Sequence, residues 1–144
     1  MIKSVKTQAV YVSNQNASLQ FFKDILGFEV RRWEPLGVAG SWIEVAPLGA
    51  ETCLVLYPRD LMPDWQHRNP SIVFKCDDVA ATHAALESRG VTFTQEPTKM
   101  GWGNFASFVD PDGNEFGLSD APDRQAPPQR ARSGSMPPPP PPPR

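Results

Sequence analysis

Two carboxylates are the groups of this sequence best placed for acid–base chemistry. Glu44 and Glu115 lie in strand-like runs, 41–45 and 115–118, at positions whose alternation turns them toward a concave sheet face. A carboxylate in such a place can act as a general base. Glu44 and Glu115 are therefore the catalytic candidates, and the sequence leaves open whether any catalysis occurs.

Aromatic residues on neighbouring strands predict a binding surface for a flat or apolar small molecule. By strand alternation Tyr11 and Tyr57 point to the same face as the two carboxylates, and Trp42 joins them from a third strand. Trp102 lies between two glycines, which favours a mobile loop over the mouth of a cavity. The predicted ligand-binding residues are Tyr11, Trp42, Tyr57, Trp102 and Glu115.

Other residues of chemical interest are interpreted as structural. The pattern does not fix the direction of Trp33 and Trp65. Both are expected in the core, the ordinary place for a large aromatic side chain. Cys53 and Cys76 lie in strand-like runs, where a reduced cysteine acts as a small apolar residue.

The elements that must position these side chains occur twice along the chain. Residues 5–13 read as a strand, and Asn14, Gln15 and Asn16 after it are helix-capping and turn residues. Residues 17–26 read as an amphipathic helix that stops at Gly27, and 28–33, 41–45 and 52–57 read as strands. After a linker at 58–70 the order returns. Residues 71–76 form a strand, Asp77 or Asp78 caps a helix that stops at Gly90, and the last three strands are 91–95, 104–109 and 115–118, with a loop over 96–103.

This repeat, with a period of about 64 residues between equivalent strand positions, predicts an α+β fold. Two βαβββ units form a curled mixed sheet around a cavity, and they account for one domain over residues 1–120. Residues 121–144 hold the run of prolines at 137–143 and a Ser-Gly-Ser segment, which predicts a disordered tail.

Composition excludes several kinds of partner. The 14 basic and 16 acidic residues are mixed along the chain and give a net charge of −2, so no nucleic-acid partner is expected. No apolar stretch is long enough to span a bilayer or to serve as a secretion signal. The expectation is a cytoplasmic protein with no membrane partner.

Two segments carry a family resemblance. Residues 10–29, VYVSNQNASLQFFKDILGFE, and residues 110–114, DPDGN, resemble the opening strand and helix and the last turn of the vicinal oxygen chelate superfamily, which includes glyoxalases, bleomycin-resistance proteins and extradiol dioxygenases. The stretches GVTFTQEPT at 90–98 and GWG at 101–103 are similar to the glyoxalase-like and bleomycin-resistance-like subgroup. The resemblance covers residues 1–120.

In metal-using members the resemblance places one ligand on each of four strands. Those positions fall here on Thr7, Tyr57, Ser71 and Gly117, none of which is a usual metal ligand. The remaining imidazoles, His67 in the linker and His83 in a helix, are interpreted as surface or packing residues. We therefore expect no metal site and no cofactor.

The resemblance and the missing ligands together favour a binding protein. The expected function is sequestration of a small aromatic or hydrophobic molecule in the cavity, as in bleomycin resistance proteins. The alternative is a glyoxalase-like or dioxygenase-like lyase or isomerase, with an atypical metal site or with Glu115 or Glu44 as base. The resemblance also implies a homodimer in which two halves complete each cavity. The identity of the ligand and the role of the tail are left open.

Overall fold

The computed structural model describes residues 1–122, so the tail predicted for 121–144 lies almost wholly outside the described residues. Two βαβββ modules follow each other along the chain. In the first, the elements are β1 (Thr7–Val12), α1 (Gln15–Leu19) with its π-helical continuation Gln20–Ile25, β2 (Glu29–Pro35), β3 (Ser41–Ala46) and β4 (Cys53–Pro58). In the second, they are β5 (Ile72–Lys75), α2 (Val79–Ser88), β6 (Thr92–Met100), β7 (Gly103–Val109) and β8 (Glu115–Ser119).

Each module forms its own mixed sheet of four strands. Sheet A has the order β1-β4-β3-β2 and sheet B has the order β5-β8-β7-β6. The first and last strands of each module pair in parallel, and the remaining pairs are antiparallel. The predicted α+β architecture of two repeated modules with mixed sheets is confirmed.

The helices begin and end where the sequence indicates. The Asn14 side chain accepts a hydrogen bond from the Ala17 amide at the start of α1, and Asp78 does the same for Ala81 at the start of α2. Asn14 and Asp78 are 64 positions apart, which matches the predicted repeat. Gly27 follows the first helix at a φ of 82°, a conformation that disfavours any side chain.

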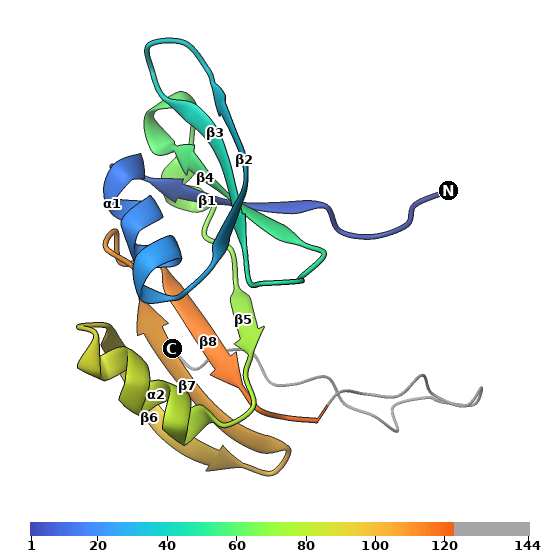
Figure 1. The fold of residues 1–144 in the computed structure, drawn as a ribbon, viewed down its shortest axis with the longest axis vertical. Helices are drawn as coiled ribbons and strands as arrows, with labels where there is room; N and C mark the ends of the chain where they lie inside the picture. The colour runs from blue at the N-terminus through green and yellow to red at the C-terminus, as the bar shows by residue number, and fades with distance from the viewer. Residues whose placement is uncertain (123–144) are drawn as a thin grey trace.

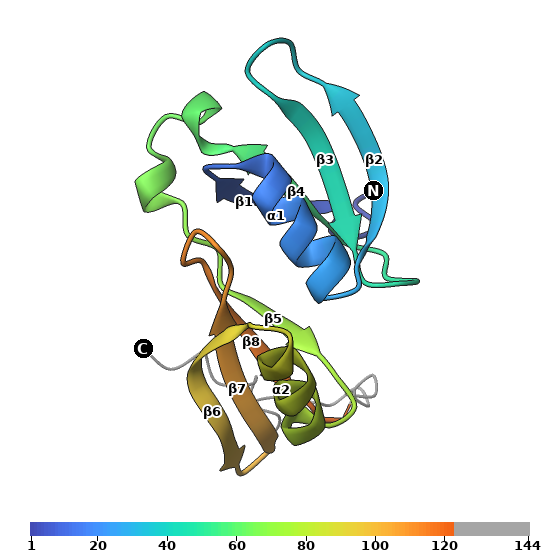
Figure 2. The same ribbon diagram turned by 60° about the vertical axis from the view of Figure 1, so that its left-hand side comes forward.

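One apolar core joins the two modules. The sheets lie one above the other, and both helices lie on the same side of them (Figures 1 and 2). Phe21 and Phe22 of the first helix contact Phe108 and Phe116 of sheet B, with ring centroids 6.3 and 5.6 Å apart. The helix of the first module is therefore packed against both sheets.

Two expectations about particular segments are wrong. The segment 96–103 was expected to be a loop, but β6 continues to Met100 and irregular pairing with β7 absorbs its extra residues. Trp33 was expected in the core, but it lies on edge strand β2 and is 53% exposed. Trp65 is also outside the core cluster, where the Arg59 guanidinium covers its ring at 4.2 Å from the centroid.

Linker 58–70 contains two short 3-10 helices, Arg59–Leu61 and Trp65–His67. No helix among residues 1–122 is long and apolar enough to cross a membrane.

Candidate functional site

Sheet A carries an aromatic surface on the face opposite to the helix. Val10 and Val12 of β1 are fully buried on the core side, whereas Tyr11 between them points the other way and is partly exposed. Tyr11 pairs with Tyr57 across β1 and β4, and the two rings meet edge to face with centroids 6.0 Å apart. The Trp42 ring contacts Tyr57 in the same manner at 6.1 Å. Three rings from three strands therefore form one continuous surface, which we call the aromatic face.

A buried carboxylate fixes one member of the aromatic face. Glu44 is only 6% exposed, and its Oε2 accepts a hydrogen bond of 2.8 Å from Trp42 Nε1. Arg32 Nη1 lies 3.8 Å from the same oxygen, while Arg32 Nε donates to Glu34 at 2.9 Å. The bond from Arg32 holds the pKa of the Glu34 carboxyl below its ordinary value. Glu44 therefore acts as a hydrogen-bond acceptor that orients the indole ring of Trp42.

Glu115 belongs to a separate polar cluster on sheet B. Its Oε2 accepts a hydrogen bond of 2.7 Å from Thr94 Oγ1, which also lies 3.0 Å from the hydroxyl of buried Ser107. Glu115 and Thr94 are exposed, so the carboxylate can still reach a ligand. The sequence did not single out Thr94 or Ser107.

Trp102 lies at the other end of sheet B. It sits in the turn between β6 and β7, is partly exposed, and contacts the ring of buried Phe105 with centroids 6.0 Å apart. Phe105 also touches the position where a Cβ on Gly117 would stand, at 2.7 Å. Glycine at position 117 thus leaves room for the Phe105 ring, a contact that the sequence analysis missed.

The five predicted ligand-binding residues therefore fall into separate groups within one chain. Tyr11, Trp42 and Tyr57 are together on sheet A, and Glu115 and Trp102 are on sheet B. Glu115 follows the turn 110–114, which contacts β1. Trp102 lies at the opposite end of β7 from that turn, and the length of this strand separates them by about 25 Å. A single chain does not gather all five around one space.

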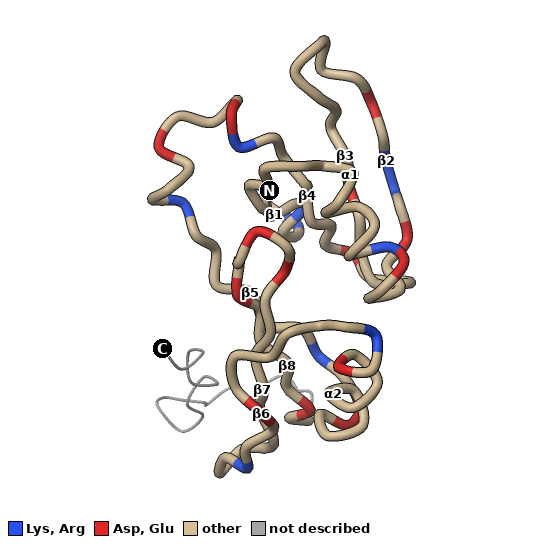
Figure 3. Tube along the Cα trace, turned by 90° about the vertical axis from the view of Figure 1, so that its left-hand side faces the viewer, with Lys and Arg blue, Asp and Glu red and all other residues tan. Residues whose placement is uncertain are grey.

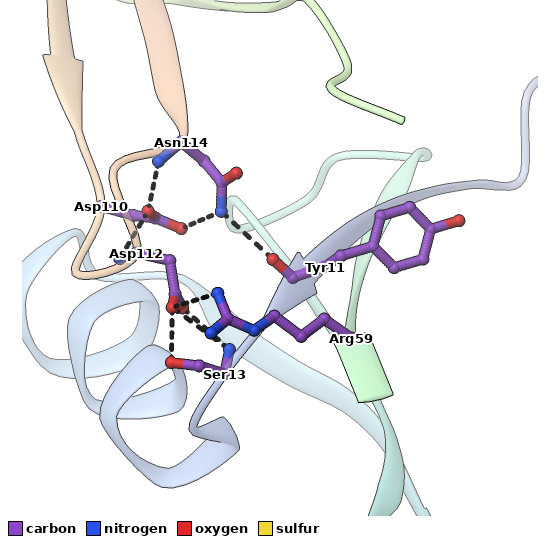
Figure 4. A network of polar contacts seen from close by, with 6 residues as sticks. All are labelled: Tyr11, Ser13, Arg59, Asp110, Asp112 and Asn114. Carbon is purple, nitrogen blue, oxygen red and sulfur yellow. Dashed lines mark hydrogen bonds and ion pairs between the residues drawn. The ribbon is translucent and has the colours of Figure 1, made fainter. Parts of the chain in front are cut away.

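The turn 110–114 ties the two modules together (Figure 4). Asp112 accepts hydrogen bonds from the backbone amide and the hydroxyl of Ser13 at the end of β1, and Arg59 Nη1 lies 3.8 Å from it. Asn114 Nδ2 donates to the Tyr11 carbonyl at 3.4 Å. These contacts fix the end of β1, and with it the backbone of Tyr11, against sheet B.

Asp110 organises the same turn from the inside. It is buried, and its Oδ1 accepts from the amides of Asp112 and Asn114 at 3.0 and 2.8 Å. Burial raises the pKa of the Asp110 carboxyl, although these hydrogen bonds oppose the rise. The DPDGN motif thus has a structural function that requires no ligand.

The four positions implied for a metal do not form a site. One ion needs donors that converge, yet Thr7 pairs with Cys53, four residues (about 13 Å) along β4 from Tyr57. Gly117 pairs with Val73, and Ser71 precedes the strand. Within residues 1–122, no three His, Cys, Asp or Glu side chains lie close enough to hold a metal. The residues present therefore do not fit the metal of the metal-using branch.

Charges are dispersed over the described trace. Figure 3 shows basic and acidic positions interspersed on both modules. Several are paired with each other, such as Arg31 with Glu29, where Nε and Oε2 are 2.6 Å apart. Arg31 also donates to the Pro47 and Ala50 carbonyls and so braces the loop between β3 and β4. Much of the local charge is thus used to hold loops and strands in place.

Comparison with known proteins decides the family. The model of the Glyoxalase/Bleomycin resistance protein/Dioxygenase superfamily matches residues 4–118. The chain belongs to this superfamily. The YetH protein of Bacillus subtilis (strain 168) is 44% identical over 120 residues, which cover 83% of this chain and 100% of YetH.

Solved structures include similar proteins with the same fold. TnmS3, an antibiotic binding protein from Streptomyces sp. CB03234, is 37% identical with a TM-score of 0.72, and the match covers 84% of this chain and 98% of TnmS3. A superfamily member from Sphaerobacter thermophilus DSM 20745 is 33% identical with a TM-score of 0.73, over 82% of this chain and 97% of that protein.

Proposed function

We propose that this superfamily member binds a small aromatic or hydrophobic molecule on the aromatic face and sequesters it without chemical change. The observation that carries the proposal is the contact of Tyr11, Tyr57 and Trp42 on a sheet face that the helix does not cover. Edge-to-face rings from adjacent strands offer a rigid apolar platform, and stacking on such a platform supplies affinity with little loss of conformational entropy.

Two further observations support sequestration. The Glu44 carboxylate, which could serve as a base, is buried and already bonded to Trp42 Nε1. TnmS3, with 37% identity, is an antibiotic binding protein, so a related chain of the same fold binds a small molecule. A toxic natural product is a ligand class consistent with the bonded Glu44 carboxylate and with the likeness to TnmS3.

A second copy of the chain covers this face, which residues 1–122 leave partly exposed. The polar cluster of Glu115, Thr94 and Ser107 and the Trp102 turn lie on sheet B, apart from the aromatic face of the same chain. In a homodimer, sheet B of one copy closes over sheet A of the other and brings the predicted residues around one cavity. Such isologous pairing creates two equivalent cavities.

The test compares two tryptophans on neighbouring strands. Trp42 belongs to the aromatic face, whereas Trp33 pairs with core residue Ile43 and therefore points to the other side. Calorimetric titration with a panel of flat hydrophobic compounds is expected to find a ligand, and Trp42→Ala is expected to weaken its binding by about 1 to 3 kcal/mol. Trp33→Ala should leave the affinity unchanged.

Two results would overturn the proposal. Equal losses from Trp33→Ala and Trp42→Ala would remove the aromatic face from the site. Conversion of the bound compound, detected by chromatography after incubation, would show an enzyme of the lyase or isomerase kind and not a sequestering protein.

A further inference from the structure

A cavity of about 280 Å³ lies on the helix side of the molecule, away from the aromatic face. Most of its wall is apolar and comes from both modules. The principal wall residues are Leu26, Phe28, Phe74, Leu86, Phe108 and Leu118. Phe108 and Leu118 are buried in the core that packs on the helices, so this cavity and the face bearing Glu115 lie on opposite sides of sheet B.

The size and chemistry of the wall match a compact ring system. A buried apolar cavity of about 150 Å³ is sufficient to hold benzene, so this volume accommodates one or two rings. Leu48, on the loop between β3 and β4, contributes to the lining although it is 83% exposed. A ligand in the cavity would cover part of this exposed leucine and so gain apolar burial.

The polar part of the lining consists of Cys76, Thr82 and Lys75. The Thr82 side chain acts to lower the pKa of the Cys76 thiol, but less than burial raises it. Burial is the main cause that raises the pKa of this thiol, and the carboxylates of Asp120 and Asp77 raise it further, so the thiol stays protonated at neutral pH. Lys75 follows Phe74 on β5, so its side chain points to the opposite face of sheet B, and the two carboxylates disfavour an anion at this end of the cavity.

We propose that this cavity is a second ligand site, for a neutral molecule of one or two rings that carries one hydroxyl or carbonyl oxygen. The rings fill the apolar part between the modules. The oxygen meets the Thr82 hydroxyl and the Cys76 thiol. This site is independent of the aromatic face, and neither proposal depends on the other.

The two cysteines of the full chain allow ligand protection to be measured at the cavity and at the aromatic face in one experiment. Cys76 lines the cavity, whereas Cys53 lies on sheet A opposite Thr7, on the same side as the aromatic face. Alkylation with iodoacetamide followed by tryptic peptide mass spectrometry separates the two, because they fall in peptides 33–59 and 76–89. With 2-naphthol at about ten times its dissociation constant, alkylation of Cys76 should slow about tenfold. The rate at Cys53 should not change.

Variants and a charged analogue sharpen the test. Leu48→Ala should raise the 2-naphthol concentration needed for half-protection by about fivefold. Val38→Ala, which truncates an even more exposed apolar side chain at the β2–β3 turn, should leave this concentration unchanged. Naphthalene-2-carboxylate should protect Cys76 less than 2-naphthol does. The proposal is overturned if Cys76 gains no protection, if only Cys53 is protected, if both variants behave alike, or if the carboxylate protects better.

Discussion

Trp102 shows how a single residue can be assigned to binding or to folding. Its indole is partly exposed in the turn before β7 and meets the ring of Phe105 edge to face. A partly exposed tryptophan in a turn is expected to contribute less to the free energy of unfolding than a buried one, and its place between Gly101 and Gly103 permits movement over a ligand.

Replacement of this residue gives the first prediction. Trp102→Ala should weaken binding of an aromatic ligand by about 1 to 3 kcal/mol and leave the melting temperature nearly unchanged. Thermal melts and fluorescence titrations of the two proteins measure both quantities. A loss of roughly 3 to 5 kcal/mol in stability would instead place Trp102 in the core. Unchanged affinity in a stable variant would remove it from the site.

At the scale of elements, the turn 110–114 connects the two modules through contacts that the sequence pattern does not predict. Asp112 lies on a tight turn of the second module, but its hydrogen-bond partner Ser13 is 99 positions away. The Asp112 side chain is 10% exposed, so its bonds are only weakly screened by water. The Ser13 amide that Asp112 binds lies between the end of β1 and the start of α1.

Asp112→Ala should therefore destabilise the fold by about 1 to 3 kcal/mol, because the Ser13 amide and hydroxyl lose a charged acceptor. The control is Asp24→Ala, which removes a carboxylate that is 56% exposed and pairs with neighbouring Lys23 at 3.3 Å. That change should alter stability by less than about 0.5 kcal/mol. Urea unfolding of the two variants measures the difference. Equal midpoints would show that the turn does not clamp β1.

At the scale of the whole molecule, the separation of sheet A and sheet B residues makes the proposed homodimer testable by mixing. Tyr57→Ala damages the aromatic face and Glu115→Ala damages the polar cluster, so each variant alone has two damaged cavities. In a mixed dimer, one cavity combines the intact sheet A of one copy with the intact sheet B of the other. The second cavity of the same dimer carries both changes.

Refolding the two variants together should thus restore about a quarter of the cavities to full affinity, since half of the dimers are mixed and each holds one intact cavity. Calorimetry with the best ligand of the panel measures the restored stoichiometry. Sedimentation velocity checks that dimers are present. No recovery in the mixture would show that each cavity is built within one chain or that Glu115 contributes nothing to it.

Apart from the segment 96–103, local pattern in the sequence was sufficient for the elements and for the direction of most strand side chains. Alternation turned Tyr11 away from the core, where its neighbours Val10 and Val12 are buried, because the strand period of two residues is set by backbone geometry alone. The helix caps at Asn14 and Asp78 were equally local, since each cap bonds an amide three residues away. The repeat of these signals identified the two modules.

What only the tertiary structure decided is which of these faces come together. The Glu44 bond to Trp42, the Thr94 contact with Glu115 and the cavity beside Cys76 depend on pairing register and on packing between modules. Trp33 was wrongly expected in the core, because an edge strand offers a tryptophan no neighbour on one side. Register and packing arise from contacts between distant segments, and a period read along one chain does not contain them.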